Sequence, residues 1–396
     1  MSKYDFDIIH DRHGTSSLKY DFAMVRKGRD DLLPLWVADM DFRLPDEILD
    51  DITARTGHGI FGYTDPDKKY YKAVQSWYSR RQGFEIEDDW ITLAPGIVYS
   101  IACAVRAFTK PGEAVLIQQP VYYPFMEVIQ LNRRELVNNQ LICRNGHYEI
   151  DFDDFERKII ENDVRLFILC SPHNPVGRVW SKEELLTMAE ICAAHGVFIY
   201  SDEIHSDFVY PGHRHTSFIT LGDKYTQKLI LGTSPSKSFN IAGLQIANII
   251  IPDRETRSKY RLENAAAGYS QGNTLGIFAA ASAYTRGEEW FEELLIYLKG
   301  NLDYVRSFIR DNIPEVRLIE PEGTYLIWLE FSALTEDPAD LERLIVEEAL
   351  LWTDSGIIFG RETALFERIN IACPRSVLEQ ALHQLYNAIR KRRVGL

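Results

Sequence analysis

The chain of 396 residues has only five cysteines, and none of them stands in a CxxC pair or another spacing typical of a metal site. A sparse, odd count in a long chain indicates reduced thiols rather than a disulfide framework. No apolar run approaches the roughly 18 residues that a membrane helix needs. The N-terminus also lacks the apolar stretch and small residues of a secretory signal. We therefore expect a cytoplasmic protein with no membrane segment and no metal.

An excess of positive charge is also missing, because 44 basic residues stand against 58 acidic residues and give a net charge of −14. Such a field repels polyanions, so nucleic acid is not expected as a partner. The content of 45% hydrophobic and 26% charged residues is ordinary for a globular protein and argues against disorder. A folded enzyme of one or two large domains is the expectation at this length.

Short apolar runs alternate with helical patterns between about Pro45 and Tyr284. Their length and β-rich composition suit strands that are buried on both faces of a mainly parallel sheet, which predicts a doubly wound α/β domain. The runs are residues 90–93, 114–117, 166–169, 197–200 and 229–231.

Long amphipathic helices around a few strands, at residues 325–329 and 369–371, replace this pattern from about Gly287 onward. We predict a large domain over residues 46–286 and a smaller α+β domain over residues 287–396. Residues 1–45 are expected to pack with the smaller domain. No Gly/Ser linker, repeat or low-complexity tract marks the boundary.

Unusual polar residues follow each of the five apolar runs. In open α/β sheets, ligands bind outside the carboxyl ends of the strands, so we expect these followers to converge on one crevice. They are residues 94–96, 119–124, 171–175, 202–205 and 234–237.

Lys237 stands among hydroxyl groups directly after the last of these runs. A lysine in a dry strand end has a lowered pKa, which frees its amine to attack an aldehyde, although a lysine by itself is more often a solvated surface charge. Asp202 ends another run and suits a protonated ring nitrogen, or equally a helix N-cap. Together the two residues predict a site for an aromatic aldehyde.

Other polar residues that follow the apolar runs supply groups that could bind the rest of such an aldehyde. The Asn174 amide suits a phenolate oxygen, or a plain Asn-Pro turn, and the Tyr122 ring suits stacking, or core packing. The turn at Gly96 leaves the N–H groups of Ile97 and Val98 at a helix start, where phosphate binds well. The Ser234 and Ser236 hydroxyls add possible donors. These parts specify pyridoxal 5′-phosphate (PLP).

At this point the sequence resembles the fold-type-I PLP enzymes of the aminotransferase class I/II group, over nearly the whole chain from residues 33–41 to 368–370. The order of Asn-Pro-x-Gly, Asp and Ser-x-Ser-Lys carries the resemblance. Within the group it is most similar to the cystathionine β-lyase and cysteine-S-conjugate β-lyase branch, which includes cystalysin. The segments that carry this closer likeness are residues 35–42, 120–125, 171–180, 201–205, 235–244 and 322–329.

The resemblance implies a role for each matching residue. Lys237 bonds covalently to PLP, Asp202 holds the pyridine nitrogen, Asn174 bonds the ring hydroxyl oxygen and Tyr122 stacks on the ring. Ser234, Ser236 and the turn of Gly96, Ile97 and Val98 are assigned to the phosphate, and His205 to the cofactor contacts.

The resemblance also assigns the substrate side. Arg368 grips the α-carboxylate of an amino acid, since a guanidinium makes two charge-assisted bonds to a carboxylate. Ala38 lies against the substrate, and Tyr123 serves as a proton relay or as a wall. Tyr63 reaches the phosphate of a neighbouring subunit, which implies a homodimer.

Two positions depart from the pattern of many aminotransferases. Gln245 stands where an arginine usually neutralises the phosphate, and His205 stands where a tyrosine is usual. Both changes fit the lyase branch better, and they leave the full set of phosphate ligands open.

The predicted function is therefore a PLP-dependent carbon–sulfur β-lyase acting on cystathionine, cysteine or related S-conjugates to give a thiol, pyruvate and ammonia. The main alternative is a PLP-dependent aminotransferase, which shares nearly every one of these residues. A non-catalytic regulatory binding protein on the same fold is a further alternative, because fold alone does not guarantee activity. The preferred sulfur amino acid and the pathway are not encoded in any motif found here.

Overall fold

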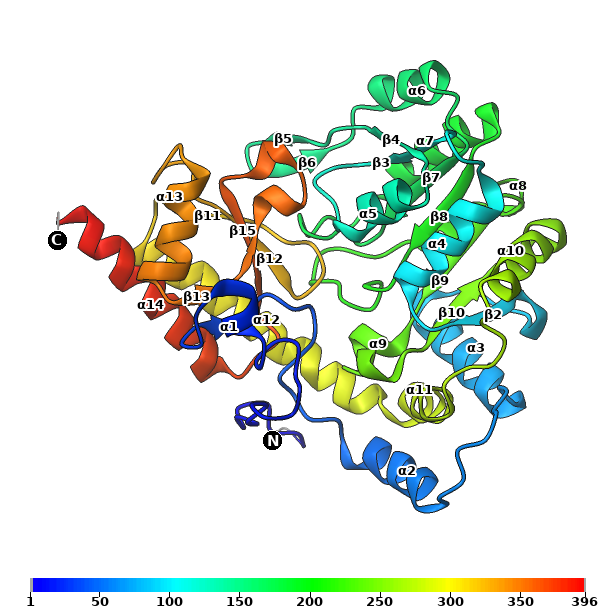
Figure 1. Ribbon diagram of the computed structural model, residues 1–396, viewed down its shortest axis with the longest axis horizontal. Helices are drawn as coiled ribbons and strands as arrows, with labels where there is room; N and C mark the ends of the chain where they lie inside the picture. Colours follow the sequence, from blue (N-terminus) through cyan, green and yellow to red (C-terminus); the bar gives the residue numbers. More distant parts are fainter. Residues whose placement is uncertain (1–2, 395–396) are drawn as a thin grey trace.

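A seven-stranded sheet forms the centre of the computed structural model, which describes residues 3–394 (Figure 1). Neighbouring strands in it are parallel, with one exception. The strand Ala247–Ile250 pairs antiparallel with both of its neighbours, Ile91–Ala94 and Leu229–Thr233. The mainly parallel α/β fold predicted from the sequence is confirmed. In spatial order the strands are β2 (Ile91–Ala94), β10 (Ala247–Ile250), β9 (Leu229–Thr233), β8 (Phe198–Asp202), β7 (Leu166–Cys170), β3 (Ala114–Ile117) and β4 (Glu135–Asn138).

Helices cover both faces of this sheet. Successive strand residues point to opposite sides, and in the central strands the residues on both sides are apolar. Val115 and Ile117 pack into one hydrophobic group, whereas Ala114 and Leu116 pack into the other. The first group lies under α4 (Ile97–Phe108), α5 (Pro124–Leu131) and α10 (Arg254–Ala266). The second lies under α3 (Lys68–Gln82), α6 (Phe152–Glu161), α7 (Lys182–His195) and α11 (Thr274–Arg286), with α2 (Asp46–Gly57) packed on α11.

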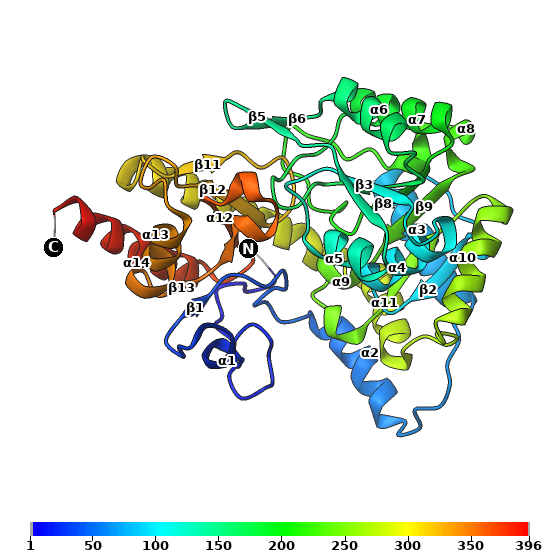
Figure 2. The same ribbon diagram turned by 45° about the horizontal axis from the view of Figure 1, so that its top comes forward.

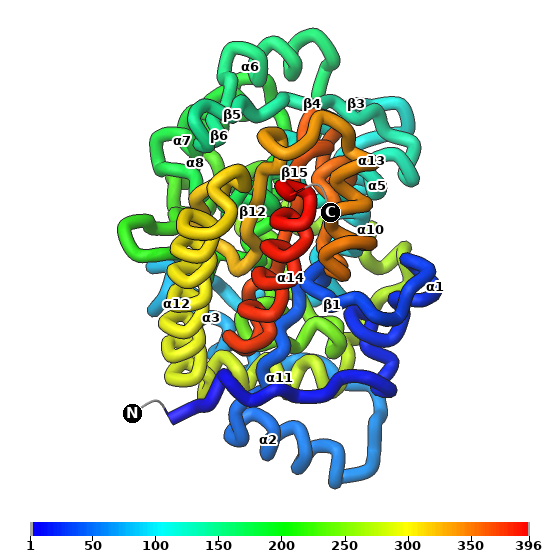
Figure 3. Tube along the Cα trace, turned by 90° about the vertical axis from the view of Figure 1, so that its left-hand side faces the viewer, coloured from blue at the N-terminus to red at the C-terminus, as the bar shows by residue number. Residues whose placement is uncertain are grey.

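A second, four-stranded antiparallel sheet lies at the other end of the molecule (Figure 2). Its strands in spatial order are β11 (Arg317–Ile319), β12 (Leu326–Glu330), β15 (Phe366–Asn370) and β14 (Asp354–Ser355). The long helix α12 (Glu288–Asn312) runs from α11 to this sheet and lies beside the C-terminal helix α14 (Arg375–Arg393) in Figure 3.

The N-terminal segment reaches the same end of the molecule through a parallel pair of strands, β1 (Leu33–Pro34) and β13 (Leu351–Trp352). Beside this pair, the rings of Trp36 and Trp352 stack with centroids 4.4 Å apart. The division into residues 1–45, 46–286 and 287–396 stays a prediction.

The remaining elements are short. They are helices α1 (Ala23–Lys27), α8 (Asp223–Thr226), α9 (Pro235–Ser238) and α13 (Pro338–Glu342), the hairpin of β5 (Ile142–Arg144) and β6 (His147–Glu149), a π-helical turn at Arg343–Glu348, and 3-10 turns at Asp88–Trp90, Phe218–Leu221, Ala242–Leu244, Gly356–Ile358 and Arg361–Thr363. Over residues 3–394, no helix combines the length and apolar character needed to cross a membrane.

Candidate active site

A cavity of about 160 Å³ lies at the carboxyl ends of β7, β8 and β9, where the sequence places its polar followers. Five segments that are distant in the sequence meet there, together with Ala38 of the 37–41 segment. The residues that line it are Ala38, Pro95, Gly96, Ile97, Val98, Tyr122, Cys170, Asn174, Asp202, Ile204, His205, Ser234, Ser236, Lys237 and Ala242. Most of the predicted site residues therefore share one cavity.

Lys237 enters the cavity from α9, a single turn that directly follows β9 and begins at the N-cap Ser234. Its Nζ donates a hydrogen bond of 2.6 Å to the backbone oxygen of Ala38. Burial lowers the pKa of the amine to about 8, an effect that Arg368 adds to and that the carboxylates of Asp39 and Asp202 oppose. An amine of this pKa is still mostly protonated at pH 7, but its neutral fraction, which can attack a carbonyl carbon, is far larger than that of an ordinary lysine.

Asp202 is the last residue of β8, and its side chain lies in the same cavity. Its Oδ1 accepts a hydrogen bond of 3.1 Å from the N–H of Ile204, so the carboxyl also closes a local turn. Burial raises the pKa of Asp202 to about 7, which the Lys237 charge partly offsets. A cationic ring nitrogen beside it lowers this pKa in turn, because opposite charges stabilise each other's charged forms.

Asn174 and Arg368 connect the two sheets. Arg368, on β15, donates from Nη1 to Asn174 Oδ1 at 2.9 Å and from Nη2 to the oxygen of Trp36 at 3.0 Å, and it forms an ion pair with Asp354. Since Asn174 Oδ1 accepts this bond, its Nδ2 is the group that remains as a donor toward the cavity. Arg368 lies behind Asn174 rather than in the cavity wall.

The phosphate end of the cavity is formed by the start of α4. No side chain caps this helix at Gly96, so its first N–H groups are available to an anion. The Ser234 hydroxyl donates to the oxygen of Ile246 at 2.7 Å and accepts from the Ser236 N–H at 3.0 Å. Ser234 is thus already engaged in capping α9, and the Ser236 hydroxyl lies 2.8 Å from it.

His205 and Tyr122 also line the cavity. Burial lowers the pKa of His205 well below 6.5, and the positive charges of Lys237 and Arg368 act in the same direction, so the imidazole is neutral. Its Nδ1 is buried and has no hydrogen-bond partner among residues 3–394. Burial raises the pKa of Tyr122, which keeps its phenol protonated.

Besides Arg368, two predicted residues lie outside this cavity. Tyr123 begins α5, half-buried, with its ring centroid 5.6 Å from that of Tyr122 and edge-on to Phe359. Tyr63 lies in the loop between α2 and α3 with 96% of its surface exposed. The Gln245 side chain, which replaces an expected arginine, is exposed.

Sequence reasoning missed three supporting residues. Tyr325 donates from Oη to the Ala38 oxygen at 2.9 Å, Asp354 pairs with Arg368, and Asn240 bonds the backbone of Met40. Asn240 and Tyr325 stood in segments recognised as similar to the family, but no local pattern gave them a partner. No sequence pattern pointed to Asp354.

These groups fit PLP. The cavity offers an amine with a lowered pKa, a buried carboxyl for the ring nitrogen, an amide donor for the ring oxygen and an uncapped helix start for the phosphate. No cluster of three or more His, Cys, Asp and Glu side chains that could hold a metal ion occurs in the described part of the chain.

Residues 30–385 match the aminotransferase class I and II family, and the chain belongs to it. It is 41% identical over 385 residues to cystathionine β-lyase PatB of Bacillus subtilis, covering 97% of this chain and 100% of that protein. It is 34% identical to the protein MalY of Escherichia coli, covering 98% and 99% of the two chains.

Solved structures give the same relationship. Cystalysin from Treponema denticola, a structure that contains PLP, superposes with a TM-score of 0.95 at 36% identity and covers 98% of this chain and 99% of its own. A PLP-bound C–S lyase from Staphylococcus hominis superposes with a TM-score of 0.90 at 33% identity, covering 98% of each chain. The predicted relationship to this group is confirmed.

Proposed function

We propose that the protein is a PLP-dependent carbon–sulfur β-lyase, which cleaves cystathionine, cysteine or related S-conjugates with water to a thiol, pyruvate and ammonia. The observation that carries this proposal is the 41% identity to a cystathionine β-lyase along the whole chain. The cavity that holds both Lys237 and Asp202 supports it, because these are the two groups that PLP chemistry requires.

The residues that hold PLP follow from the donor set. Lys237 provides the amine for the aldehyde, Asp202 keeps the ring nitrogen protonated, and Asn174 Nδ2 donates to the ring oxygen. The N–H groups at the start of α4 and the Ser236 hydroxyl serve the phosphate, and Tyr122 packs on the ring. When bound, PLP supplies an electron-withdrawing ring that stabilises negative charge at the substrate Cα.

The chain's own groups then handle the substrate. Arg368 binds the α-carboxylate and so orients the Cα–H bond, with Asp354 balancing part of its charge. The Lys237 amine, whose neutral form is more accessible because burial lowers its pKa to about 8, takes the Cα proton as general base. Tyr123, half-buried beside Tyr122, forms a wall or a proton relay at the substrate's sulfur side. The Ala38 oxygen anchors the lysine at the substrate side of the cavity.

A substrate panel tests the function. Purified holoenzyme is given cystathionine, cysteine or an S-alkyl cysteine, and pyruvate is measured with and without an added keto acid. A lyase releases pyruvate over many turnovers without keto acid. Turnover that stops after one equivalent and resumes only with keto acid indicates an aminotransferase and contradicts the proposal.

We also propose that the active unit is a homodimer in the cytoplasm. The 96% exposed Tyr63 stands near the exposed apolar side chains of Ile60 and Phe61, which supports a role for this loop across an interface, with Tyr63 serving the partner's phosphate. All five cysteines are unpaired, which is typical of a reducing compartment. A molecular mass of two chains in solution is expected, and a monomer with full PLP affinity contradicts the dimer.

A further inference from the structure

The backbone oxygen of Ala38 is the direct hydrogen-bond partner of the Lys237 amine, at 2.6 Å, and it also accepts from Tyr325 Oη at 2.9 Å. Ala38 belongs to residues 37–41, here named the strap, which contain no helix or strand. A segment outside regular structure has no ladder of backbone hydrogen bonds to fix its carbonyl groups. The position of this oxygen therefore depends on what fastens the strap.

Two asparagines fasten the strap from opposite sides. Asn370, at the end of β15, donates from Nδ2 to the oxygens of Val37 at 2.6 Å and Asp39 at 2.5 Å. Asn240, three positions after Lys237, accepts from the N–H of Met40 at 2.9 Å and donates to the Met40 oxygen at 2.8 Å. The strap thus connects the small sheet with the lysine's own segment.

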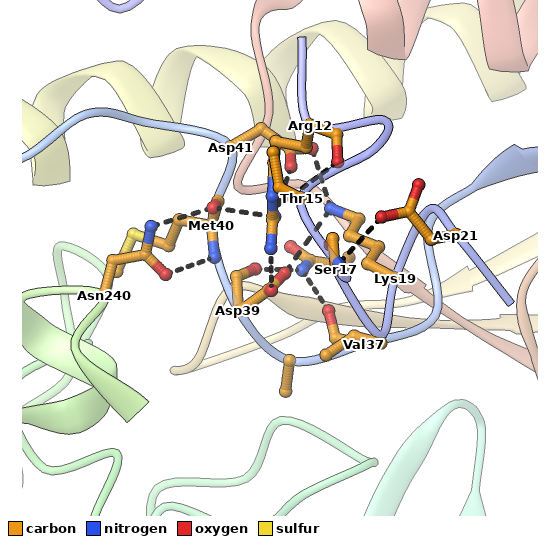
Figure 4. Close-up of polar contacts among 12 residues, drawn as sticks. Arg12, Thr15, Ser17, Lys19, Asp21, Val37, Asp39, Met40, Asp41 and Asn240 are labelled. Atoms are coloured by element: carbon orange, nitrogen blue, oxygen red, sulfur yellow. Dashed lines mark hydrogen bonds and ion pairs between the residues drawn. The ribbon is translucent and has the colours of Figure 1, made fainter. Parts of the chain in front are cut away.

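Two cations outside the strap, Arg12 and Lys19, pair with its two carboxylates, Asp39 and Asp41 (Figure 4). Arg12 donates to Asp39 Oδ2 at 2.6 Å and to Asp41 Oδ1 at 2.8 Å. Lys19 donates to Asp41 Oδ2 at 2.7 Å, and its Nζ lies 3.8 Å from Asp39 Oδ1. The Lys19 side chain is fully buried and that of Asp41 is 4% exposed, so these are costly charges to leave unpaired.

The loop that presents Arg12 and Lys19 is braced internally. The Thr15 hydroxyl donates to the oxygen of Arg12 at 2.7 Å, and the Asp21 carboxylate accepts from the N–H groups of Gly14 and Ser17, both at 2.9 Å. Figure 4 shows Thr15, Ser17 and Asp21 of this loop beside Arg12 and Lys19. The loop therefore provides a fixed frame for both cations.

The strap separates the PLP cavity from a second, larger one of about 650 Å³. Ala38, Lys237 and Ala242 line both cavities, and Arg12 and Asp39 line only the larger. Three of the four charged residues, Arg12, Asp39 and Asp41, thus line a space that Lys237 also lines.

We infer that Arg12 and Lys19 are positioning residues, which fix the strap through Asp39 and Asp41 and thereby hold the Ala38 oxygen against the Lys237 amine. This inference rests on the proposed role of Lys237 as the residue that binds PLP. Neither cation lies in the PLP cavity, so both act through the strap.

The cluster also sets a charge near the amine. The carboxylate of Asp39 raises the pKa of Lys237, and Arg12, which binds that carboxylate, offsets part of its negative field. Removing Arg12 and removing the charge of Asp39 should therefore move the titration of Lys237 in opposite directions. The other titratable groups around the amine are Asp202, Arg368, His205, Tyr122 and Tyr325.

The test compares Arg12→Met, Asp39→Asn and the wild-type holoenzyme by the pH dependence of the visible absorbance of bound PLP. The same chains freed of PLP are then reductively methylated across a pH series, and modification of Lys237 is followed by mass spectrometry. We expect the midpoint to rise in Arg12→Met and to fall in Asp39→Asn, each by roughly half a pH unit or more. Arg29→Met is the matched control, because Arg29 pairs with Asp31 outside the cluster.

Equal midpoints in all chains, or a shift of both variants in the same direction, overturn the inference. If Arg12→Met does not fold, the Asp39→Asn variant alone decides the test. Asparagine has the same shape as aspartate, and the titration midpoint of Lys237 must fall in this variant. Neither measurement requires turnover. A wild-type chain that binds no PLP or releases no pyruvate refutes the proposed function instead, so the two failures are distinguishable.

Discussion

The strand-end edge of the large sheet and the strap meet at Lys237, but the chain builds them differently. At the edge, Asp202 ends β8, and Asn174 and Lys237 lie four residues beyond the ends of β7 and β9, so the main chain itself delivers them to the cavity. The strap has no regular structure and is held by side chains from residues 12, 19, 240 and 370. The reactive groups are supplied locally, and their alignment is supplied by distant segments.

Charge is handled differently in the two regions as well. At the edge, burial lowers the pKa of Lys237 to about 8 and raises that of Asp202 to about 7. In the strap, Arg12 and Lys19 pair with Asp39 and Asp41 inside the protein. Substitutions at the edge should therefore impair the reaction, and substitutions in the cluster should reduce stability first.

The largest effect is expected from Lys237→Ala. Without the amine, no group in the cavity is placed to take the Cα proton, so pyruvate release from cystathionine should fall by about a thousandfold or more. The measurement is pyruvate formation together with the absorbance of bound PLP. Lys110→Ala, at an exposed lysine, is the control. If Lys237→Ala retained more than a tenth of the activity, Lys237 would not be the general base of the reaction.

Lys19→Met tests the other region. It leaves the buried Asp41 with one cation fewer, so the free energy of unfolding should fall by about 3 kcal/mol, as measured by urea denaturation. The control is Lys27→Met, because the pair of Lys27 with Glu342 is partly exposed and should contribute less than about 1 kcal/mol. Equal losses in both variants would remove the distinction between a buried cluster and an ordinary ion pair.

Asp202→Asn removes a charge at the edge while keeping an oxygen for the Ile204 N–H. We expect kcat to fall on the order of a hundredfold. In the PLP-free chain, the folded state holds the Asp202 proton up to about pH 7, whereas the unfolded state releases it near pH 3.8. The free energy of unfolding should therefore fall as pH rises through this range. The variant should lack this decline in urea unfolding experiments. An unchanged kcat would argue against a ring nitrogen beside Asp202.

The smallest effect is expected from Arg368→Lys. The lysine keeps a positive charge near Asp354 but loses the planar fork, so KM for cystathionine should rise about tenfold with a smaller change in kcat. Steady-state kinetics measure the split. A change in kcat alone would indicate that Arg368 aligns Asn174 and does not bind the substrate carboxylate.

The sequence predicted the centre of the fold well, because two-sided burial leaves a clear pattern. The five apolar runs correspond to β2, β3, β7, β8 and β9, each within one or two residues. The strands β4 and β10 were missed, since half of the residues in Glu135–Asn138 are polar and no unusual polar residues drew attention to the end of Ala247–Ile250.

Most of the predicted residues at strand ends share one cavity, whereas contacts between distant parts of the chain left no local pattern in the sequence. Asp354 approaches Arg368 only because β14 pairs with β15, and Tyr123 turned out to lie beside the cavity rather than in its wall. The motif Asp39-Met40-Asp41 was visible as part of a family likeness, yet its partners Arg12 and Lys19 lie more than 20 residues earlier in a loop without periodicity.

By itself the sequence determined the parallel sheet, the candidate lysine and the acid that accompanies it, since apolar periodicity and the residues after each strand are local properties of the chain. Only the tertiary structure decided which backbone oxygen holds the lysine and which cations hold that oxygen. Hydrogen bonds between residues 199 positions apart, as between Lys237 and Ala38, depend on how separate elements pack, and no local pattern records that packing.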